Sequence, residues 1–500
     1  MMAWLQAVFV CVLLLGPVFA AQADEVPLSE ASQECMDCHV SITPGIVADW
    51  QRSRHARISP AMGLKAEESA RRISVDQVPA ELADVAVGCA ECHTARADAH
   101  GDTFEHNGYE VHLVVSPGDC ATCHPVEAGQ YDQNLMARAY DNLKNNPLYQ
   151  VQEKSIIDRP DFAHGKMAYA PANDLTRAET CYACHGTKID IVGTELRDTD
   201  LGEMEFPRLS GWPNQGVGRM NPDGSRGSCT ACHTRHGFAL EMARKPHTCK
   251  QCHVGPDVPA YKVYSASKHG NIYSSMSRHF DFNAVPWTVG RDFTAPTCAT
   301  CHISMLADGD GNELVGRSHQ MTDRLPWRLF GLIYAHPQPK SPDTTVIRNT
   351  VGISAPTDFK GNFATAYLID EEEMARRTAT MQAVCLSCHG RAWVGGHFQR
   401  LDNAIAETNH FVRASTGIME AIWEAGLARP DNPMDEIIEK KWMDTWLFYG
   451  NTIRFASAMA GGGDYGVYAG GRYQLNQRIT ELEAWYQERN SARKAAPPAE

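Results

Sequence analysis

The pattern of apolar and polar residues divides the chain into three parts of different character. Residues 4–20 are almost wholly apolar, and a small-x-small cleavage pattern follows them at Ala21-Gln22-Ala23. This arrangement predicts that residues 1–23 are a secretory signal peptide, with an uncleaved membrane anchor as the alternative. A long middle part shows little regular periodicity, and a helical period appears only after residue 400.

The C-terminal part carries two runs of apolar residues at helical spacing. The first run contains Ile437, Ile438, Trp442, Trp446 and Ile453, and the second contains Leu475, Ile479, Leu482 and Trp485. Recurrence near 3.6 residues predicts amphipathic helices. Residues 431–433 (Asp-Asn-Pro) have the composition of a helix start, and residues 491–500 read as a disordered tail. These helices pack either on the rest of the chain or between subunits.

The middle part is rich in residues that interrupt regular structure. The chain contains 27 Pro and 39 Gly, and the stretches 186–228 and 303–384 are dense in turn-forming residues. Residues 442–467 form the most apolar later run, but Asp444, Arg454 and Asp464 interrupt it. A membrane-spanning helix needs about 20 apolar residues without such charges. We therefore expect no membrane span in the mature chain.

Composition excludes several classes of function. Hydrophobic residues make up 43% and charged residues 21% of the 500 positions, which is ordinary for a globular protein. Asp and Glu total 60 against 46 Lys and Arg, so the net charge is −14. A nucleic-acid partner requires basic stripes that meet phosphate. We therefore expect no nucleic-acid partner.

Cysteine spacing carries the strongest chemical signal. Of the 17 cysteines, Cys11 lies in the predicted signal peptide, and the other sixteen form eight Cys-x-x-Cys-His motifs with none left over. The motifs are Cys35-x-x-Cys38-His39, Cys89-x-x-Cys92-His93, Cys120-x-x-Cys123-His124, Cys181-x-x-Cys184-His185, Cys229-x-x-Cys232-His233, Cys249-x-x-Cys252-His253, Cys298-x-x-Cys301-His302 and Cys385-x-x-Cys388-His389.

The histidine that follows every pair identifies the chemistry of the motif. Cys-x-x-Cys alone fits a redox dithiol, half of a zinc site or a haem attachment site, but only haem attachment needs the histidine. Two thiols three positions apart each bond a vinyl group of one porphyrin, and the adjacent imidazole reaches the iron. We therefore predict eight covalently attached c-type haems. Attachment outside the cytoplasm agrees with the signal peptide and predicts a periplasmic or otherwise exported protein.

This cofactor content determines the expected fold. We predict a mainly α multihaem cytochrome c with little β structure, a haem-packed core and C-terminal helices. The expected segments are the signal peptide at 1–23, an octahaem domain at 24–400, a C-terminal helical region at 401–490 and the tail at 491–500.

Thirteen histidines outside the motifs are available as second axial ligands. A haem with two histidine ligands is closed and transfers electrons, whereas a haem with an open position binds a substrate. Seven closed haems and one open haem would use seven of the thirteen. Local context favours His55, His164, His236, His269 and His319, and His106 and His112 compete for one or two sites. His397 and His410 are further candidates.

Beyond the haem count, the chain resembles the octahaem hydroxylamine oxidoreductase family. Residues 229–270 (CTACHTRHGFALEMARKPHTCKQCHVGPDVPAYKVYSASKHG) are similar to the family's run through haems five and six. Residues 295–302 (APTCATCH) are similar to its seventh motif. The resemblance covers roughly residues 30–480 and is strongest between 229 and 302.

The resemblance implies that the fourth haem is the catalytic one, with His185 as its iron ligand. The family places an Asp-His pair on the substrate side shortly after motif six. Here the pair reads Asp257-Val258, so the carboxylate is retained and the histidine is replaced. Asp257 would then transfer protons, and its alternative role is that of a turn residue after Pro256.

Oxidative members of the family carry a C-terminal tyrosine that bonds to the catalytic haem of a neighbouring subunit. The corresponding candidate is Tyr465, which follows a glycine run, with Tyr468 in reserve. The alternative for Tyr465 is a loop tyrosine at a subunit contact. Members without this bond are associated with reduction. A related type of nitrite reductase has a lysine in place of the histidine of one motif, whereas all eight motifs here end in histidine. The resemblance also implies a homotrimer.

Three functions follow from these observations. The first is oxidation of hydroxylamine, a small inorganic nitrogen compound, at the open haem. Tyr465 favours this function, and Val258 argues against it. The second is reduction of nitrite or hydroxylamine on the same scaffold. The third is electron transfer alone through eight closed haems. An electron-accepting or electron-donating redox protein, or a quinone-linked cytochrome, would be the partner.

Overall fold

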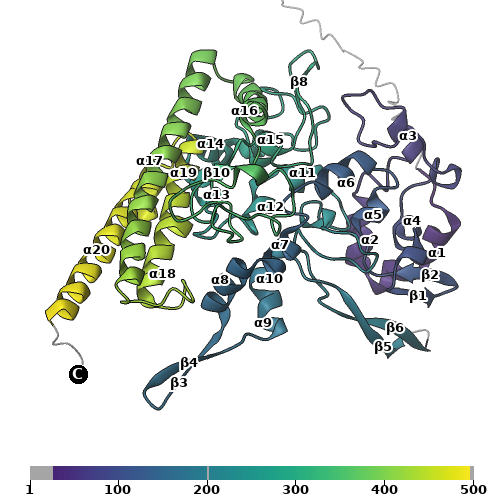
Figure 1. Cartoon of the computed structure of the whole chain (residues 1–500). Coiled ribbons are helices and arrows are strands. Elements are labelled where there is room, and N and C mark those ends of the chain that lie inside the picture. Colours follow the sequence, from purple (N-terminus) through teal and green to yellow (C-terminus); the bar gives the residue numbers. More distant parts are fainter. Residues whose placement is uncertain (1–25, 200–201, 496–500) are drawn as a thin grey trace, which may run out of the picture.

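A computed structural model describes residues 26–199 and 202–495. The predicted signal peptide and Cys11 lie outside these residues. The described chain is mainly helical with a few short strands, which confirms the predicted fold class (Figure 1). In residues 26–199 and 202–495, no helix is both long enough and apolar enough to cross a membrane.

Most helices of the first 300 residues are short. They are α1 (Glu30–Ile42), α2 (Pro44–Gln51), α3 (Pro60–Leu64), α4 (Cys89–His93), α5 (Pro117–Cys120), α6 (Pro125–Asp132), α7 (Ala139–Asn145), α8 (Pro147–Ile157), α9 (Asp174–Glu179), α10 (Cys181–His185), α11 (Leu240–Arg244), α12 (Pro246–Lys250), α13 (Ala260–Ala266), α14 (Lys268–Met276) and α15 (Cys298–His302). Proline occupies the first turn of α2, α3, α5, α6, α8 and α12, where its missing N–H costs nothing. These prolines start new helices at frequent intervals.

In the part of the chain that the structure describes, the strands form five antiparallel pairs. They are β1 (Thr103–His106) with β2 (Tyr109–His112), β3 (Arg159–Ala163) with β4 (Lys166–Ala170), β5 (Asp190–Thr199) with β6 (Gly202–Ser210), β7 (Leu306–Ala307) with β8 (Glu313–Val315), and β9 (Trp327–Arg328) with β10 (His336–Pro337). The hairpins β3–β4 and β5–β6 project from the body of the molecule (Figure 1). At the tip of β3–β4, His164 and Gly165 both have positive φ, as a tight hairpin turn requires.

Longer helices form the C-terminal part. They are α16 (Glu371–Leu386), α17 (Arg391–Glu424), α18 (Ile437–Met443), α19 (Gly450–Ala458) and α20 (Arg472–Ala495), with π-helical segments η6 (Asp444–Tyr449) and η7 (Tyr465–Ala469). Helices α17 to α20 lie together along one side of the molecule, far from the N-terminal helices (Figure 1). Their shared core contains Met419, Ile422, Trp442, Trp446 and Leu482, none more than 1% exposed.

Several predicted boundaries in this part are wrong. The helix expected to start at residues 431–433 starts at Ile437, because the Glu436 and Glu439 side chains form a capping box there. The expected boundary at residue 400 falls inside α17. Residues 491–495, predicted as tail, continue α20. Residues 496–500 lie outside the described residues.

We predict that packing of α17 stabilises the C-terminal helices substantially. Ile422 is fully buried, whereas Ile437 is 68% exposed. Ile422→Ala is expected to lower the free energy of unfolding by about 2–5 kcal/mol, because it removes buried apolar area and leaves a cavity. Ile437→Ala, the matched control, is expected to change it by less than about 1 kcal/mol. Guanidinium unfolding of the holoprotein, followed by circular dichroism, measures both, and equal effects would contradict this packing.

Candidate haem cavity

All eight Cys-x-x-Cys-His motifs border one continuous cavity of about 2500 Å³. Both cysteines and the histidine of every motif lie on its wall, which is mostly apolar. Native interiors are close-packed and rarely contain voids much larger than a water molecule. A space of this size, bordered by all the attachment residues, therefore fits a set of large apolar prosthetic groups.

Local helix geometry gives each motif its shape. Helices α4, α10 and α15 each begin at the first cysteine of a motif and end at its histidine. Residues three apart share one face of a helix. The two thiols of such a motif therefore point to the same side, and the imidazole follows one residue later.

The sixteen cysteines of the described chain form no disulfide. Within residues 26–199 and 202–495, the one cluster of three or more potential metal ligands contains no cysteine. The cysteines are therefore not grouped as a structural zinc site requires.

Five motif histidines face a second imidazole across the cavity. An iron with nitrogen ligands at about 2 Å on both sides would place the two ring centroids about 6 Å apart. The observed pairs are His39–His106 at 6.2 Å, His55–His124 at 6.3 Å, His93–His236 at 6.5 Å, His233–His319 at 6.4 Å and His269–His389 at 6.1 Å. The structure thus brings five of the seven predicted second ligands to a motif histidine at a spacing that fits a closed haem.

His93 also lies 6.1 Å from His112, but on the other side of the ring. Its Nδ1 is 2.8 Å from the backbone oxygen of His112, so its Nε2 points away from that residue. His236 therefore faces the iron-binding side of His93. His112 and His164 are the two predicted ligands that do not line the cavity. His164 is exposed at the tip of the β3–β4 hairpin.

Three motif histidines, His185, His253 and His302, take part in no ring pair of this kind among the described residues. Burial lowers the pKa of each, to about 4 for His302. Neutral imidazoles are the form that binds a metal. The structure thus pairs five motif histidines, whereas the sequence predicts seven closed haems.

The predicted catalytic aspartate lies near two motif histidines, His185 and His253, and Arg328 is near His185. The Asp257 carboxylate raises the pKa of His185 and the Arg328 guanidinium lowers it, both less strongly than burial lowers it. All three side chains line the cavity. Asn451, which is 1% exposed, donates a hydrogen bond from Nδ2 to the backbone oxygen of Asp257 at 2.8 Å. The structure therefore joins motif four, the loop after motif six and α19 in one site.

The predicted cross-linking tyrosine lies apart from this site within its own chain. Tyr465 begins η7, is half-buried and does not line the cavity. Burial raises the pKa of its hydroxyl. Tyr468 is 60% exposed and contacts Tyr473. Both tyrosines are thus near the surface, where a neighbouring subunit can reach them.

Sequence reasoning gave His397 as a further candidate and did not single out His336, Arg328 or Asn451. His397, buried at 6% exposure, lies on the cavity wall. His336 is fully buried away from that wall, its Nδ1 lies 2.6 Å from the backbone oxygen of Pro337, and its Nε2 has no partner. Arg328 and Asn451 carry no motif that could have identified them.

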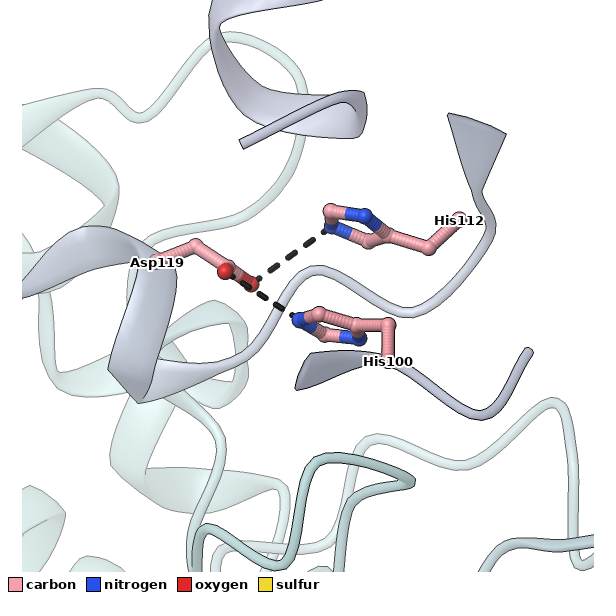
Figure 2. A group of neighbouring side chains, drawn as sticks. All are labelled: His100, His112 and Asp119. Atoms are coloured by element: carbon pink, nitrogen blue, oxygen red, sulfur yellow. Dashed lines mark hydrogen bonds and ion pairs between the residues drawn. The ribbon is translucent and has the colours of Figure 1, made fainter. Parts of the chain in front are cut away.

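A second group of polar residues is buried between motifs two and three (Figure 2). The rings of His100 and His112 stack at 3.7 Å, and both face the Asp119 carboxylate. Asp102 and Asp223 add two more carboxylates near His100. Burial lowers the pKa of His100, but its hydrogen bonds to Asp102 and Asp119 prevail and raise it to about 9.

Known families and structures match this chain over most of its length. The family profile described as "Seven times multi-haem cytochrome CxxCH" matches residues 219–327, and "Cytochrome c554 and c-prime" matches residues 27–112 and 119–202. A solved "Hypothetical multiheme protein" is 37% identical, with a TM-score of 0.88 over 95% of this chain and 98% of that one.

Two more distant relatives come from Kuenenia stuttgartiensis. A curated "Probable nitrite reductase-hydroxylamine oxidoreductase fusion protein" is 23% identical over 421 residues, which is 81% of this chain. The chain spans 40% of the length of that relative. A solved reducing HAO-like protein complex has a TM-score of 0.58 at 20% identity over 92% of this chain and 85% of that one, which shows a shared fold.

Proposed function

Because this chain belongs to the multihaem c-type cytochromes and is similar to hydroxylamine oxidoreductase-like proteins, we propose that it is an exported octahaem oxidoreductase acting on small inorganic nitrogen compounds. The reaction we favour is hydroxylamine oxidation at the fourth motif. One observation carries this assignment: of the three motif histidines without a facing imidazole among the described residues, His185 is the one near both Asp257 and Arg328.

The cofactors and the protein divide the chemistry. Haems bound at these motifs supply one-electron redox steps and, where an axial position stays open, a place for a small ligand. His185 would hold the iron of the open site. The paired histidines, such as His55 and His124, would hold irons that are closed to substrate and suited to electron transfer.

Asp257 has the chemistry to move protons to and from the bound nitrogen compound. A carboxylate within reach of a substrate N–H or O–H acts as a general base, and its acid form returns the proton. Asn451 fixes the backbone of Asp257 by a hydrogen bond of 2.8 Å. The Arg328 guanidinium adds a positive charge on the same wall, which attracts an anion such as nitrite.

Reduction of nitrite or hydroxylamine is the second candidate. Arg328 and the replacement of the family's histidine by Val258 favour it, as does the named relative with a nitrite reductase part. Two assays of the purified holoprotein separate the directions. One follows hydroxylamine with an oxidised dye acceptor, and the other follows nitrite with a reduced dye donor and measures ammonia and hydroxylamine. If neither assay shows turnover, electron transfer without catalysis is the function that remains.

We predict that Tyr465 forms the oxidative cross-link to a neighbouring subunit. Its near-surface position on η7 leaves it accessible to a second chain. Mass spectrometry of the proteolysed holoprotein should find the peptide with Tyr465 joined to a haem peptide containing Cys181 and Cys184. In Tyr465→Phe this species should vanish, whereas Tyr468→Phe should retain it. A Tyr465 peptide free of haem would contradict the oxidative assignment.

The remaining features of the proposal concern the setting of the enzyme. We propose export to the periplasm or an equivalent compartment, assembly as a homotrimer, and exchange of electrons with a redox protein or a quinone-linked cytochrome. The net charge of −14 favours a partner with a basic docking surface.

A further inference from the structure

The buried group of His100, His112 and Asp119 has no role in the proposed function. His100 and His112 do not line the haem cavity, and only Asp119 reaches its wall. The three residues come from the loop before β1, the end of β2 and helix α5. Polar side chains this deeply buried need either complete hydrogen bonding or a bound ion.

Distances within the group match a metal site better than a hydrogen-bond network. Each residue offers one ligand atom, and these atoms lie within 4.8 Å of one another. His100 Nε2 is 3.1 Å from Asp119 Oδ1, and His112 Nε2 is 3.6 Å from Asp119 Oδ2. Bonds of about 2.0–2.1 Å around a tetrahedral ion place the ligand atoms about 3.3 Å apart. The 3.6 Å separation is too long for a hydrogen bond.

His112 supplies an independent observation. It is fully buried, and neither of its ring nitrogens has a hydrogen-bond partner. Its Nε2 points at Asp119, as Figure 2 shows. An unpaired buried imidazole destabilises the folded state, because its ring nitrogens lose their hydrogen bonds to water. A cation between His112 and Asp119 would remove this cost.

The surroundings have the second-shell features of a metal site. Asp102 lies 3.3 Å from Nδ1 of His100, and Nε2 of the same ring faces Asp119 Oδ1 at 3.1 Å, where an ion would lie between the two atoms. Its other oxygen accepts the backbone N–H groups of Leu113 and Val114 at 3.0 and 2.9 Å, so the carboxylate is held in place. A carboxylate that orients a metal-bound histidine is a common feature of zinc sites.

The charges around the two imidazoles favour a cation as well. Three carboxylates with buried side chains, those of Asp102, Asp119 and Asp223, surround the imidazoles, and Arg96 pairs with two of them. Metal binding requires both imidazoles in their neutral form, and the group then carries two excess negative charges that one divalent ion would neutralise. Asp223 Oδ2, 4.0 Å from His100 Nε2, is placed to become a fourth ligand.

We propose that His100, His112 and Asp119 bind one divalent cation of the zinc class, separate from the haem irons. Two imidazoles and a carboxylate are the ligand set that favours Zn²⁺ and its neighbours over Ca²⁺ or Mg²⁺. The ion joins β2 to α5, and α5 ends at Cys120 of the third motif. Its role is structural, because His100 and His112 are off the cavity wall.

The test uses the holoprotein and Zn²⁺ alone as the probe. A chelator first removes exchangeable metal from the protein, which is then dialysed against Zn²⁺ and afterwards against metal-free buffer. Elemental mass spectrometry then measures the number of zinc ions per chain. We expect one tightly held zinc per chain, with an X-ray absorption spectrum that shows nitrogen and oxygen neighbours and no sulfur. No zinc retention, or a sulfur-ligated zinc, would overturn the proposal.

Variants locate the ion. His112→Gln should abolish retention, and His279→Gln, on an exposed histidine, should not change it. Asp102→Asn keeps all three ligands and is expected to weaken Zn²⁺ binding about 10–100-fold. If the haem spectrum shows that His112→Gln does not fold, the Zn²⁺ affinity of Asp102→Asn tests the assignment instead. Wild-type affinity in Asp102→Asn, or retention in a folded His112→Gln, would overturn the assignment.

Discussion

Replacing His185 by glycine should reduce turnover of hydroxylamine, or of nitrite in the reducing direction, by at least about 10³-fold. A metal centre that binds and polarises a substrate contributes several kcal/mol, and each 1.4 kcal/mol is a factor of ten. His185 has no imidazole opposite it among the described ring pairs, so its loss removes the one protein ligand that we assign to the substrate-binding iron. Stopped-flow and steady-state assays with dye acceptors and donors measure the change.

Two controls separate this effect from loss of the cofactor or of the fold. Cys181 and Cys184 remain in the variant, so the number of covalently bound haems should stay at the wild-type value. His279→Gly, at an exposed position, should keep full activity. Turnover above half of the wild-type rate in His185→Gly would show that another motif carries the reaction.

Asp257→Asn should lower kcat by about 10²–10⁴-fold and leave KM almost unchanged. This range is typical for loss of a general acid or base. The amide keeps the shape of the side chain, and the hydrogen bond from Asn451 goes to the backbone oxygen, so the loop should stay in place. The acid limb of the pH–rate profile should flatten, because the group that must lose its proton is gone.

Two further variants, one at an exposed carboxylate and one that keeps a carboxylate at position 257, serve as controls for Asp257→Asn. Asp431→Asn, in a side chain that is 75% exposed, should leave kcat and the pH profile unchanged. Asp257→Glu should recover part of the activity. If Asp257→Asn retains the wild-type pH profile, Asp257 is the turn residue that its position after Pro256 also allows.

The type of cofactor and the fold class could be predicted from the sequence, because the residues that bind a c-type haem lie next to one another in the chain. Two thiols and an imidazole within five residues need no tertiary structure to be recognised. A chain built around such groups forms short helices between them, as α4, α10 and α15 do at their own motifs.

Second axial ligands depend on contacts between distant segments, so spacing alone could not select them. His106 and His112 end the two strands of one hairpin, yet only His106 faces a motif histidine across the cavity. His112 turns instead toward His100 and Asp119. His164 lies at a hairpin tip because His164 and Gly165 form the turn.

Other parts of the site had no local signal. Asn451 is 194 residues away from Asp257, and Arg328 reaches the site from β9. Helix α18 starts at Ile437, where Glu436 and Glu439 cap it, and not at residues 431–433, where Pro433 predicted a start. Tertiary contacts and capping side chains thus decided what composition and periodicity left open.

Electron paramagnetic resonance of the oxidised holoprotein tests the central claim most directly. We predict mostly low-spin haems together with at least one high-spin haem, whose signal changes on addition of hydroxylamine, nitrite or cyanide and whose g-values are altered in His185→Gly. A spectrum in which every iron is low-spin and none responds to these ligands would contradict the assignment of an open haem.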